Sequence, residues 1–132
     1  MTQRNIYAMD IIVTKLAEGK KISKALKEVY SKRNVCIPYN KDEMNVEVTS
    51  LKMNARATNP LLRTRLKTIG DVVNFCYDNK ITDITNFGKA SGIELFETIL
   101  DYFWDRMTEK EKTAFLIDTV ERNSENICIE IA

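Results

Sequence analysis

The chain of 132 residues has no histidine, and it has only three cysteines, four glycines, two prolines and one tryptophan. The lack of histidine removes the usual general base and the usual partner of a catalytic triad. Cys36, Cys76 and Cys128 are widely spaced and form no C-x-x-C pair, so we expect reduced, mostly buried thiols and no zinc site. We find no nucleophile paired with a base, so we expect no enzyme activity and no cofactor.

Long apolar runs are also missing. None approaches the roughly 20 residues that span a membrane. The N-terminal stretch, which includes Asp10, lacks the uninterrupted apolar region of a signal peptide. We therefore expect a cytoplasmic protein without a membrane partner, built as one domain or as one small domain with an appendage.

Charge is distributed unevenly along the chain, although the net charge is only +1. Residues 1–67 hold 14 Lys and Arg against 6 Asp and Glu, whereas residues 68–132 hold 6 against 13. A basic half beside an acidic half is typical of a face that binds a polyanion. Simple attraction between the two halves is the alternative interpretation.

Helical spacing of apolar residues predicts an N-terminal hairpin. Ile6, Met9, Ile12, Val13 and Leu16 mark a first helix that Gly19 can close, and Ile22, Ala25, Leu26, Val29 and Tyr30 mark a second. The other face of the second helix carries Lys20, Lys21, Lys24 and Lys27. The pair is compatible with a DNA-reading helix-turn-helix, but a plain helical hairpin is the more typical form.

The middle of the chain marks a boundary. Residues 35–39 should be extended, and Pro38 bars them from a central strand. Residues 40–43 form a polar connection, so we predict an N-terminal appendage at 1–45 and a second domain at 46–132. Residues 46–53 leave open a strand followed by a helical turn. The alternating tail from Ile127 leaves open a short edge strand.

Capping pairs indicate where the later helices begin. Thr68 pairs with Asp71, Ser91 with Glu94, and Thr108 with Glu111, and the last two open helices that reach about Met107 and about Arg122. Leu61, Leu62 and Leu66 should share one helix. The expected buried side chains of the helix after Thr68 are Val72, Val73, Phe75 and Cys76. The fold class is therefore all-α, with a helix-hairpin-helix arrangement and room only for short edge strands.

Two polar clusters carry the clearest functional pattern, residues 54–59 and 86–91. Gly88 can open a helix whose unpaired N–H groups attract phosphate, with Lys89 adding charge and Ser91 a hydroxyl. Arg56 can enter a narrow minor groove, and Asn59 can bond base edges or sugar oxygens. Taken singly, each cluster could be only a turn or a solvated arginine. Taken together, they suit a surface that grips a phosphate backbone and reaches into a groove.

The stretch from Val48 to about Leu100 resembles the C-terminal domain of the alpha subunit of bacterial RNA polymerase. The matching pieces are Val48-x-x-Leu51-x-Met53, Arg56-Ala57-x-Asn59-x-Leu61, Leu66-x-Thr68-Ile69-Gly70-Asp71-Val72-Val73 and Asn86-Phe87-Gly88-Lys89-x-Ser91. The resemblance implies a compact bundle of short helices, binding to the minor groove of A/T-rich promoter DNA, and contacts with RNA polymerase or other transcription factors. The DNA face that it implies consists of Arg56, Asn59, Asn86, Gly88, Lys89 and Ser91.

The chain also departs from that pattern. Pro60 directly follows Asn59, and because proline fits only the first turn of a helix, the first helix is expected to start later and to leave Arg56 in a loop. Ala90 stands where the family usually carries a second lysine, so one expected phosphate contact is lost. The residues before position 48 and the helices after Leu100 differ from the family, which favours a stand-alone relative.

Three alternatives remain. Glu94, Glu97, Asp101 and Asp105 could hold a metal ion, but a solvated acidic stripe opposite Ile93, Phe96, Leu100, Phe103 and Met107 is the simpler interpretation. Tyr102, Phe103 and Trp104 in a row indicate core packing, with a partner surface or homodimer as the other option. The module could also bind RNA polymerase, sigma or another regulator without binding DNA.

Overall fold

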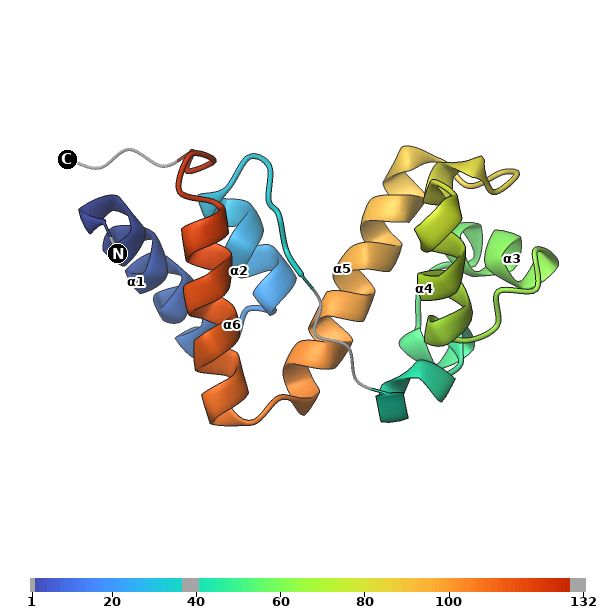
Figure 1. Ribbon diagram of the computed structural model, residues 1–132, viewed down its shortest axis with the longest axis horizontal. Helices are drawn as coiled ribbons and strands as arrows, with labels where there is room; N and C mark the ends of the chain where they lie inside the picture. Colours follow the sequence, from blue (N-terminus) through green and yellow to red (C-terminus); the bar gives the residue numbers. More distant parts are fainter. Residues whose placement is uncertain (1, 37–40, 129–132) are drawn as a thin grey trace. The chain divides into compact units, whose positions relative to one another are not determined.

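The computed structural model describes residues 2–36 and 41–128, and these residues form helices joined by turns (Figure 1). The α-helices are α1 (Gln3–Ala17), α2 (Ile22–Val29), α3 (Ala55–Arg63), α4 (Ile69–Asp78), α5 (Lys89–Arg106) and α6 (Glu109–Arg122). Three 3-10 helices, η1 (Lys41–Asn45), η2 (Val48–Leu51) and η3 (Ile81–Asp83), lie between them. The described part of the chain contains no strand, so the all-α prediction is confirmed. None of its helices combines the length and apolar character needed to cross a membrane.

The chain divides into two compact units. Unit 1 contains Met1–Ile37 and Phe103–Ala132, and unit 2 contains Pro38–Tyr102. Helix α5 therefore begins in unit 2 and ends in unit 1. The first boundary lies near the polar connection expected at residues 40–43, of which Asn40 falls outside the described residues. The division into domains at 1–45 and 46–132 stays a prediction, whereas the contacts group α6 with the two N-terminal helices.

Unit 1 is built on the predicted hairpin of α1 and α2. Gly19, with φ of 90°, ends α1 in a Schellman motif in which the N–H of Lys20 donates to the carbonyl of Lys15 at 3.1 Å. The buried face of α2 is the predicted one, Ile22, Ala25, Leu26 and Val29, followed by Tyr30. The helix predicted from Ile6, Ile12 and Val13 is confirmed as α1. Its buried side chains are Asn5, Ala8 and Ile12, whereas Ile6 and Val13 are exposed. Small Ala8 lets α1 approach its neighbours closely.

Asn123 joins the ends of unit 1. Its side chain is fully buried and accepts a hydrogen bond from the backbone N–H of Asn34 at 2.7 Å. Its amide nitrogen donates to the carbonyls of Asn34 at 3.0 Å and Thr119 at 2.7 Å. Because a buried amide is costly unless it is satisfied, this residue fixes the segment after α2 against the end of α6.

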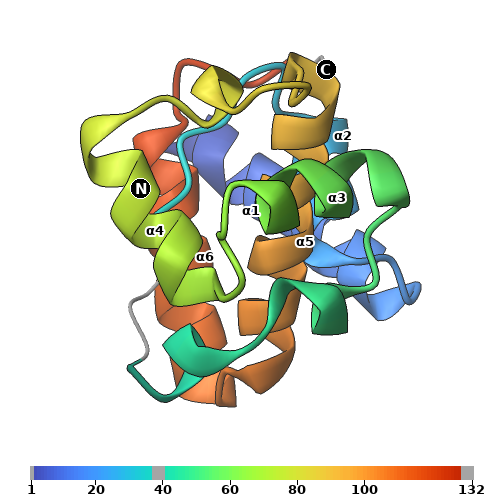
Figure 2. The same ribbon diagram turned by 90° about the vertical axis from the view of Figure 1, so that its right-hand side faces the viewer.

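Unit 2 is organised around the start of α4 (Figure 2). Thr68 and Asp71 form the predicted capping box, and Ile69 donates its N–H to the carbonyl of Val46 at 2.9 Å. A single antiparallel bridge joins Glu47 to Thr68, and residues 48–51 form a 3-10 turn, which decides the question left open for 46–53. The core of unit 2 consists of Val48, Leu51, Ala57, Leu61, Leu66, Ile69, Val72, Ile84, Phe87, Leu95, Ile99 and Leu100.

Several predictions for side chains and helix ends are wrong. Cys36, Cys76 and Cys128 are exposed, because the last turns of α4 leave the core and the other two cysteines lie in loops. Leu66 is buried, but it follows α3, which ends at Arg63. Ile93 is 46% exposed, because the buried face of α5 runs through Leu95 and Ile99.

The aromatic run of α5 lies mainly in the core, as predicted. Phe103 and Trp104 are buried, and Trp104 packs edge-on against Phe115 with ring centroids 5.9 Å apart. The hydroxyl of Tyr102 donates to Glu43 at 2.7 Å. The predicted capping box of Thr108 and Glu111 opens α6, which ends at Arg122. The tail beyond Cys128, with Ile129 and Ile131, lies outside the described residues.

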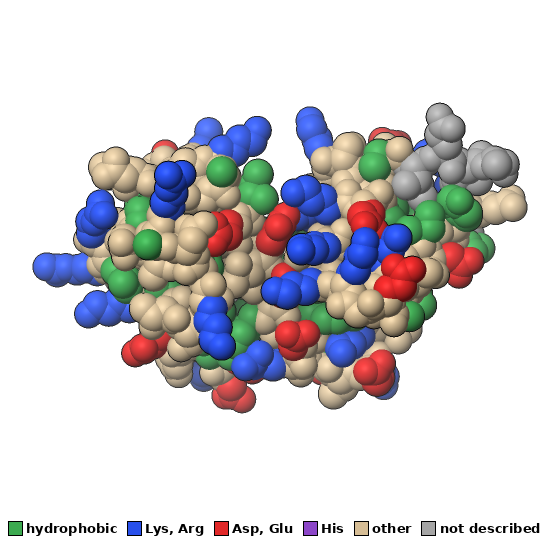
Figure 3. Space-filling view, turned by 180° about the vertical axis from the view of Figure 1, so that it is seen from behind, with side chains coloured by type: hydrophobic (Ala, Val, Ile, Leu, Met, Phe, Trp, Pro, Cys, Tyr) green, Lys and Arg blue, Asp and Glu red, His purple; other side chains and the backbone are tan. Residues whose placement is uncertain are grey.

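Each of the two units contains residues from both the basic and the acidic half of the sequence. Unit 1 holds 12 Lys and Arg, 8 before residue 38 and 4 after residue 102, against 10 Asp and Glu, and unit 2 holds 8 against 9. Basic and acidic side chains are interspersed on the face in Figure 3. The large asymmetry along the sequence therefore becomes near-neutrality in each unit, and any basic face must be local.

Gly70 provides a test of unit 2. A Cβ at this position would lie 2.9 Å from the backbone oxygen of Met44, which cannot move without shifting η1. We expect Gly70→Ala to lower the free energy of unfolding by about 1–3 kcal/mol through overpacking, measured by urea denaturation. Gly88→Ala is the matched control, because a Cβ there meets no atom within 4 Å. Equal stability of the two variants would contradict the close contact.

Candidate nucleic-acid interface

Helix α3 begins before the predicted site residues rather than after them. Asn54 is its N-cap, with a side-chain oxygen that accepts the N–H of Ala57 at 3.1 Å. Arg56 is therefore the second residue of the helix, and the expectation that it lies in a loop is wrong. Pro60 lies inside the helix, where it removes the donor that would otherwise bond the carbonyl of Arg56. Its ring is buried, and its own carbonyl accepts the hydroxyl of Thr64 at 2.9 Å.

A carboxylate of α5 fixes the start of α3. Glu94 accepts the backbone N–H of Asn54 at 3.0 Å with one oxygen and the side-chain amide of Asn54 at 2.7 Å with the other. The predicted capping pair of Ser91 with Glu94 is therefore wrong. Because α5 already begins at Lys89, Ser91 lies within its first turn. The carboxylate of Glu94 instead accepts hydrogen bonds from Asn54, the N-cap of α3.

The second polar cluster is a turn that enters α5. Asn86 has φ of 64°, a left-handed conformation that asparagine adopts more readily than most residues. Phe87 is buried and anchors the turn, and its N–H donates to the carbonyl of Ile84 at 3.0 Å. The carbonyl of Gly88 accepts the N–H of Gly92 at 3.0 Å, so Gly88 stands at the N-cap position of α5. The prediction that a helix opens at Gly88 is confirmed.

The two clusters meet in one surface depression of about 370 Å³. Four of the six predicted site residues line it: Arg56 and Asn59 from α3, Asn86 from the turn, and Ser91 from α5. Ala55, Pro60 and Arg63 complete the lining. Among the residues that the structure describes, no acidic side chain lines it, so the walls offer guanidinium, amide and hydroxyl donors to an anion.

Gly88 and Lys89 lie at the start of α5 beside that lining and are both exposed, although neither contributes to it. Within the described part of the chain, no side chain accepts a hydrogen bond from the N–H groups of Lys89, Ala90 or Ser91. These donors, together with the positive end of the helix dipole, suit a phosphate group.

Sequence reasoning missed Arg63. It follows Arg56 by seven residues, so the two lie on one face of α3. The spacing was readable in the sequence, but the expectation of a later helix start at Pro60 obscured it. Lys52, Arg56, Arg63, Arg65 and Lys67 are all exposed, and the sequence holds no acidic residue between Glu47 and Asp71. Among the residues that the structure describes, no carboxylate forms an ion pair with either Arg56 or Arg63.

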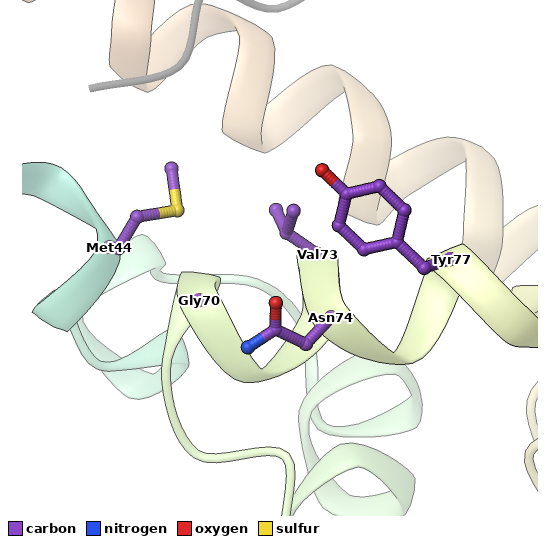
Figure 4. Close-up of a pocket in the computed structure, with 5 residues that line it drawn as sticks. All are labelled: Met44, Gly70, Val73, Asn74 and Tyr77. Atoms are coloured by element: carbon purple, nitrogen blue, oxygen red, sulfur yellow. The ribbon is translucent and has the colours of Figure 1, made fainter. Parts of the chain in front are cut away.

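A second depression in unit 2, of about 460 Å³, has a different character (Figure 4). Met44 of η1 and Gly70, Val73, Asn74 and Tyr77 of α4 line it, with no charged side chain. Tyr77 is 79% exposed, the largest exposed fraction among the large hydrophobic side chains described. An exposed aromatic ring beside an uncharged hollow suits contact with another protein more than contact with phosphate.

The acidic side chains of α5 are partly engaged in the fold. Glu94 bonds Asn54 as described, which removes it from a solvated stripe. In residues 2–36 and 41–128, no three Cys, Asp or Glu side chains converge as metal ligands would.

Residues 37–101 match the family described as the C-terminal domain of the alpha chain of bacterial RNA polymerase, and these limits lie within one residue of those of unit 2. The chain thus contains a module like that domain, and the family is one of DNA-binding, transcription-related domains that interact with DNA and transcription factors. No curated protein and no solved structure gives a significant match.

The bond between Glu94 and Asn54 can be tested by a double-mutant cycle. We expect Glu94→Ala to lower the free energy of unfolding by about 1 kcal/mol, since the variant removes a charged acceptor from two donors. Because Asn54→Ala removes the side-chain donor of this contact and leaves the backbone N–H, the two effects should be non-additive by at least about 0.5 kcal/mol in urea denaturation. Glu121→Ala, which removes an exposed carboxylate of α6, is the control. Additive effects would contradict the coupling.

Proposed function

Because residues 37–101 form a module like the C-terminal domain of the RNA polymerase alpha chain, we propose that this chain is a transcription-related protein that binds duplex DNA through the depression between α3 and α5. The observation that carries the proposal is the convergence of Arg56, Asn59, Asn86 and Ser91 on one depression, whose described lining contains no acidic side chain. We extend the proposed contact to Gly88 and Lys89 at the start of α5, and to Arg63.

The two sides of the depression suit different parts of DNA. The free N–H groups at the start of α5, with Lys89 and Ser91, suit a backbone phosphate, which fixes position without reading sequence. The guanidinium of Arg56 is long enough to enter a minor groove, and narrow A/T-rich grooves attract arginine most strongly. The proposed ligand is therefore an A/T-rich duplex, bound with modest sequence preference in the bacterial cytoplasm.

A second candidate function is a protein-interaction module that binds RNA polymerase, sigma or another regulator and does not bind DNA. Tyr77 favours it, since this exposed ring borders the uncharged depression on α4. The two candidates use different surfaces of unit 2, so variants of each surface separate them.

We expect Arg56→Ala to weaken binding to an A/T-rich duplex by about 1–3 kcal/mol, because the variant loses a charged contact in the groove. Fluorescence anisotropy with a labelled duplex at two salt concentrations measures the change. Arg56→Lys should recover only part of the affinity, since lysine lacks the planar guanidinium.

Lys80→Ala is the matched control for charge, because it removes an exposed cation of unit 2 that does not line the depression. It should bind nearly as well as the wild type. If Arg56→Ala binds the A/T-rich duplex unchanged at both salt concentrations, the site is wrong.

For the second candidate, we expect Tyr77→Ala to weaken pull-down of purified RNA polymerase or sigma at least several-fold while leaving DNA affinity unchanged, because aromatic anchors dominate protein interfaces. Thr82→Ala, which alters an exposed position on η3, serves as the control. Loss of polymerase capture together with an absence of salt-sensitive DNA binding in the wild type would favour this function over the first.

A further inference from the structure

The outer face of α2 carries a row of lysines that the proposed DNA site does not use. Lys24 and Lys27 lie on α2, Lys21 is its N-cap and Lys20 precedes it; all four are exposed, and we call these four residues the lysine face. Exposed Lys32 follows soon after the helix. From Gly19 to Asn34 the sequence has a single acidic residue, Glu28, so this local surface is strongly positive. It lies in unit 1, outside the residues that match the family.

Glu28 neutralises only one edge of this face. Its carboxylate bonds Lys20 at 2.6 Å and lies 3.7 Å from the ammonium group of Lys15, and the hydrogen bond from Lys20 lowers the pKa of Glu28. Within the described part of the chain, Lys21, Lys24 and Lys27 form no ion pair. Three ammonium groups therefore remain available to an external anion.

The buried face of α2 indicates whether the lysine face suits a lipid surface or duplex DNA. Ile22, Ala25, Leu26 and Val29 are at most 1% exposed, so the helix has no free apolar side to insert into a lipid surface. Lys21 is the N-cap of α2, and Lys27 follows it by six residues, which is about 9 Å along a helix. Duplex DNA carries one charge per about 1.7 Å of its axis, so several phosphates lie within that length.

We propose that the lysine face of α2 is a second DNA contact, which binds duplex phosphates without reading base sequence. Lysine acts as a compact point charge, and α2 contains no arginine, asparagine or glutamine that could bond a base edge in two places. The inference rests on the proposed function in that duplex DNA is the ligand, but it uses different residues in the other unit.

The test is the double variant Lys24→Gln and Lys27→Gln in the full chain. These two lysines are chosen because neither is part of the ion pairs of Glu28, so thermal unfolding should not change. Binding is measured by anisotropy over a salt series, with A/T-rich and G/C-rich duplexes of one length. We expect the slope of log K against log salt to become shallower by about 2, with equal loss of affinity on both duplexes.

The matched control is the double variant Arg4→Gln and Lys110→Gln, which removes two exposed cations from other helices of unit 1. It should keep the slope of the wild type. Equal effects of the two double variants would overturn the inference, since they would indicate a diffuse charge effect. A wild-type slope in Lys24→Gln/Lys27→Gln would overturn it as well.

Arg56→Ala separates this inference from the proposed function. If Arg56→Ala binds normally and Lys24→Gln/Lys27→Gln binds weakly, the lysine face stands and the depression in unit 2 is not the DNA site. If Arg56→Ala binds weakly and Lys24→Gln/Lys27→Gln binds normally, the depression remains the DNA site and the inference about the lysine face is overturned. If the wild type binds phosphatidylserine vesicles, and Lys24→Gln/Lys27→Gln abolishes that binding but leaves duplex binding unchanged, the lysine face binds membranes. That result would overturn the inference.

Discussion

The hydrogen bonds between Glu94 and Asn54 are the constraint on which the candidate site depends. Asn54 both caps α3 and donates to a carboxylate of α5, so one residue sets the start of one helix and its distance from another. Arg56 and Asn59 follow Asn54 within the next turn and a half, and Ser91 precedes Glu94 by one turn. Because the bonds between Glu94 and Asn54 hold α3 against α5 beside the depression, they favour a rigid arrangement of the donors that line it.

The charge asymmetry between the two halves of the sequence is not kept in the fold. The basic and acidic halves are brought together within each unit, so net charge no longer distinguishes one part of the protein from another. Positive character survives only where a whole element lacks acidic residues, as between Glu47 and Asp71, or where one helix face collects lysines, as on α2. Local arrangement, and not the total, determines where a polyanion can bind.

Much of the fold could be predicted because its helix ends are encoded locally. Thr68 with Asp71, Thr108 with Glu111 and Gly19 each act through neighbours in the sequence, and all three were predicted as observed. Ser91 with Glu94 fits the same pattern but fails, because the partner of Glu94 is 40 residues away. Such a contact has no local signature.

The site was predictable to a similar extent. Its residue types and their order were readable, but the position of Arg56 was not, because a proline beyond the first turn of a helix is unusual, and here Pro60 is buried within α3. The buried face of α1 depended on Asn5 and Ala8, one polar and one small, which apolar periodicity does not select.

Unit 1 is made of two segments that flank unit 2 in the sequence, and this order has a consequence for synthesis. When α1 and α2 leave the ribosome, their partner α6 has not yet been made, although unit 2 can be completed in between. At roughly 5–20 residues per second, the wait lasts several seconds. During that time α1 lacks its contacts with α6, so the apolar side chains of this hairpin are open to aggregation and chaperone binding.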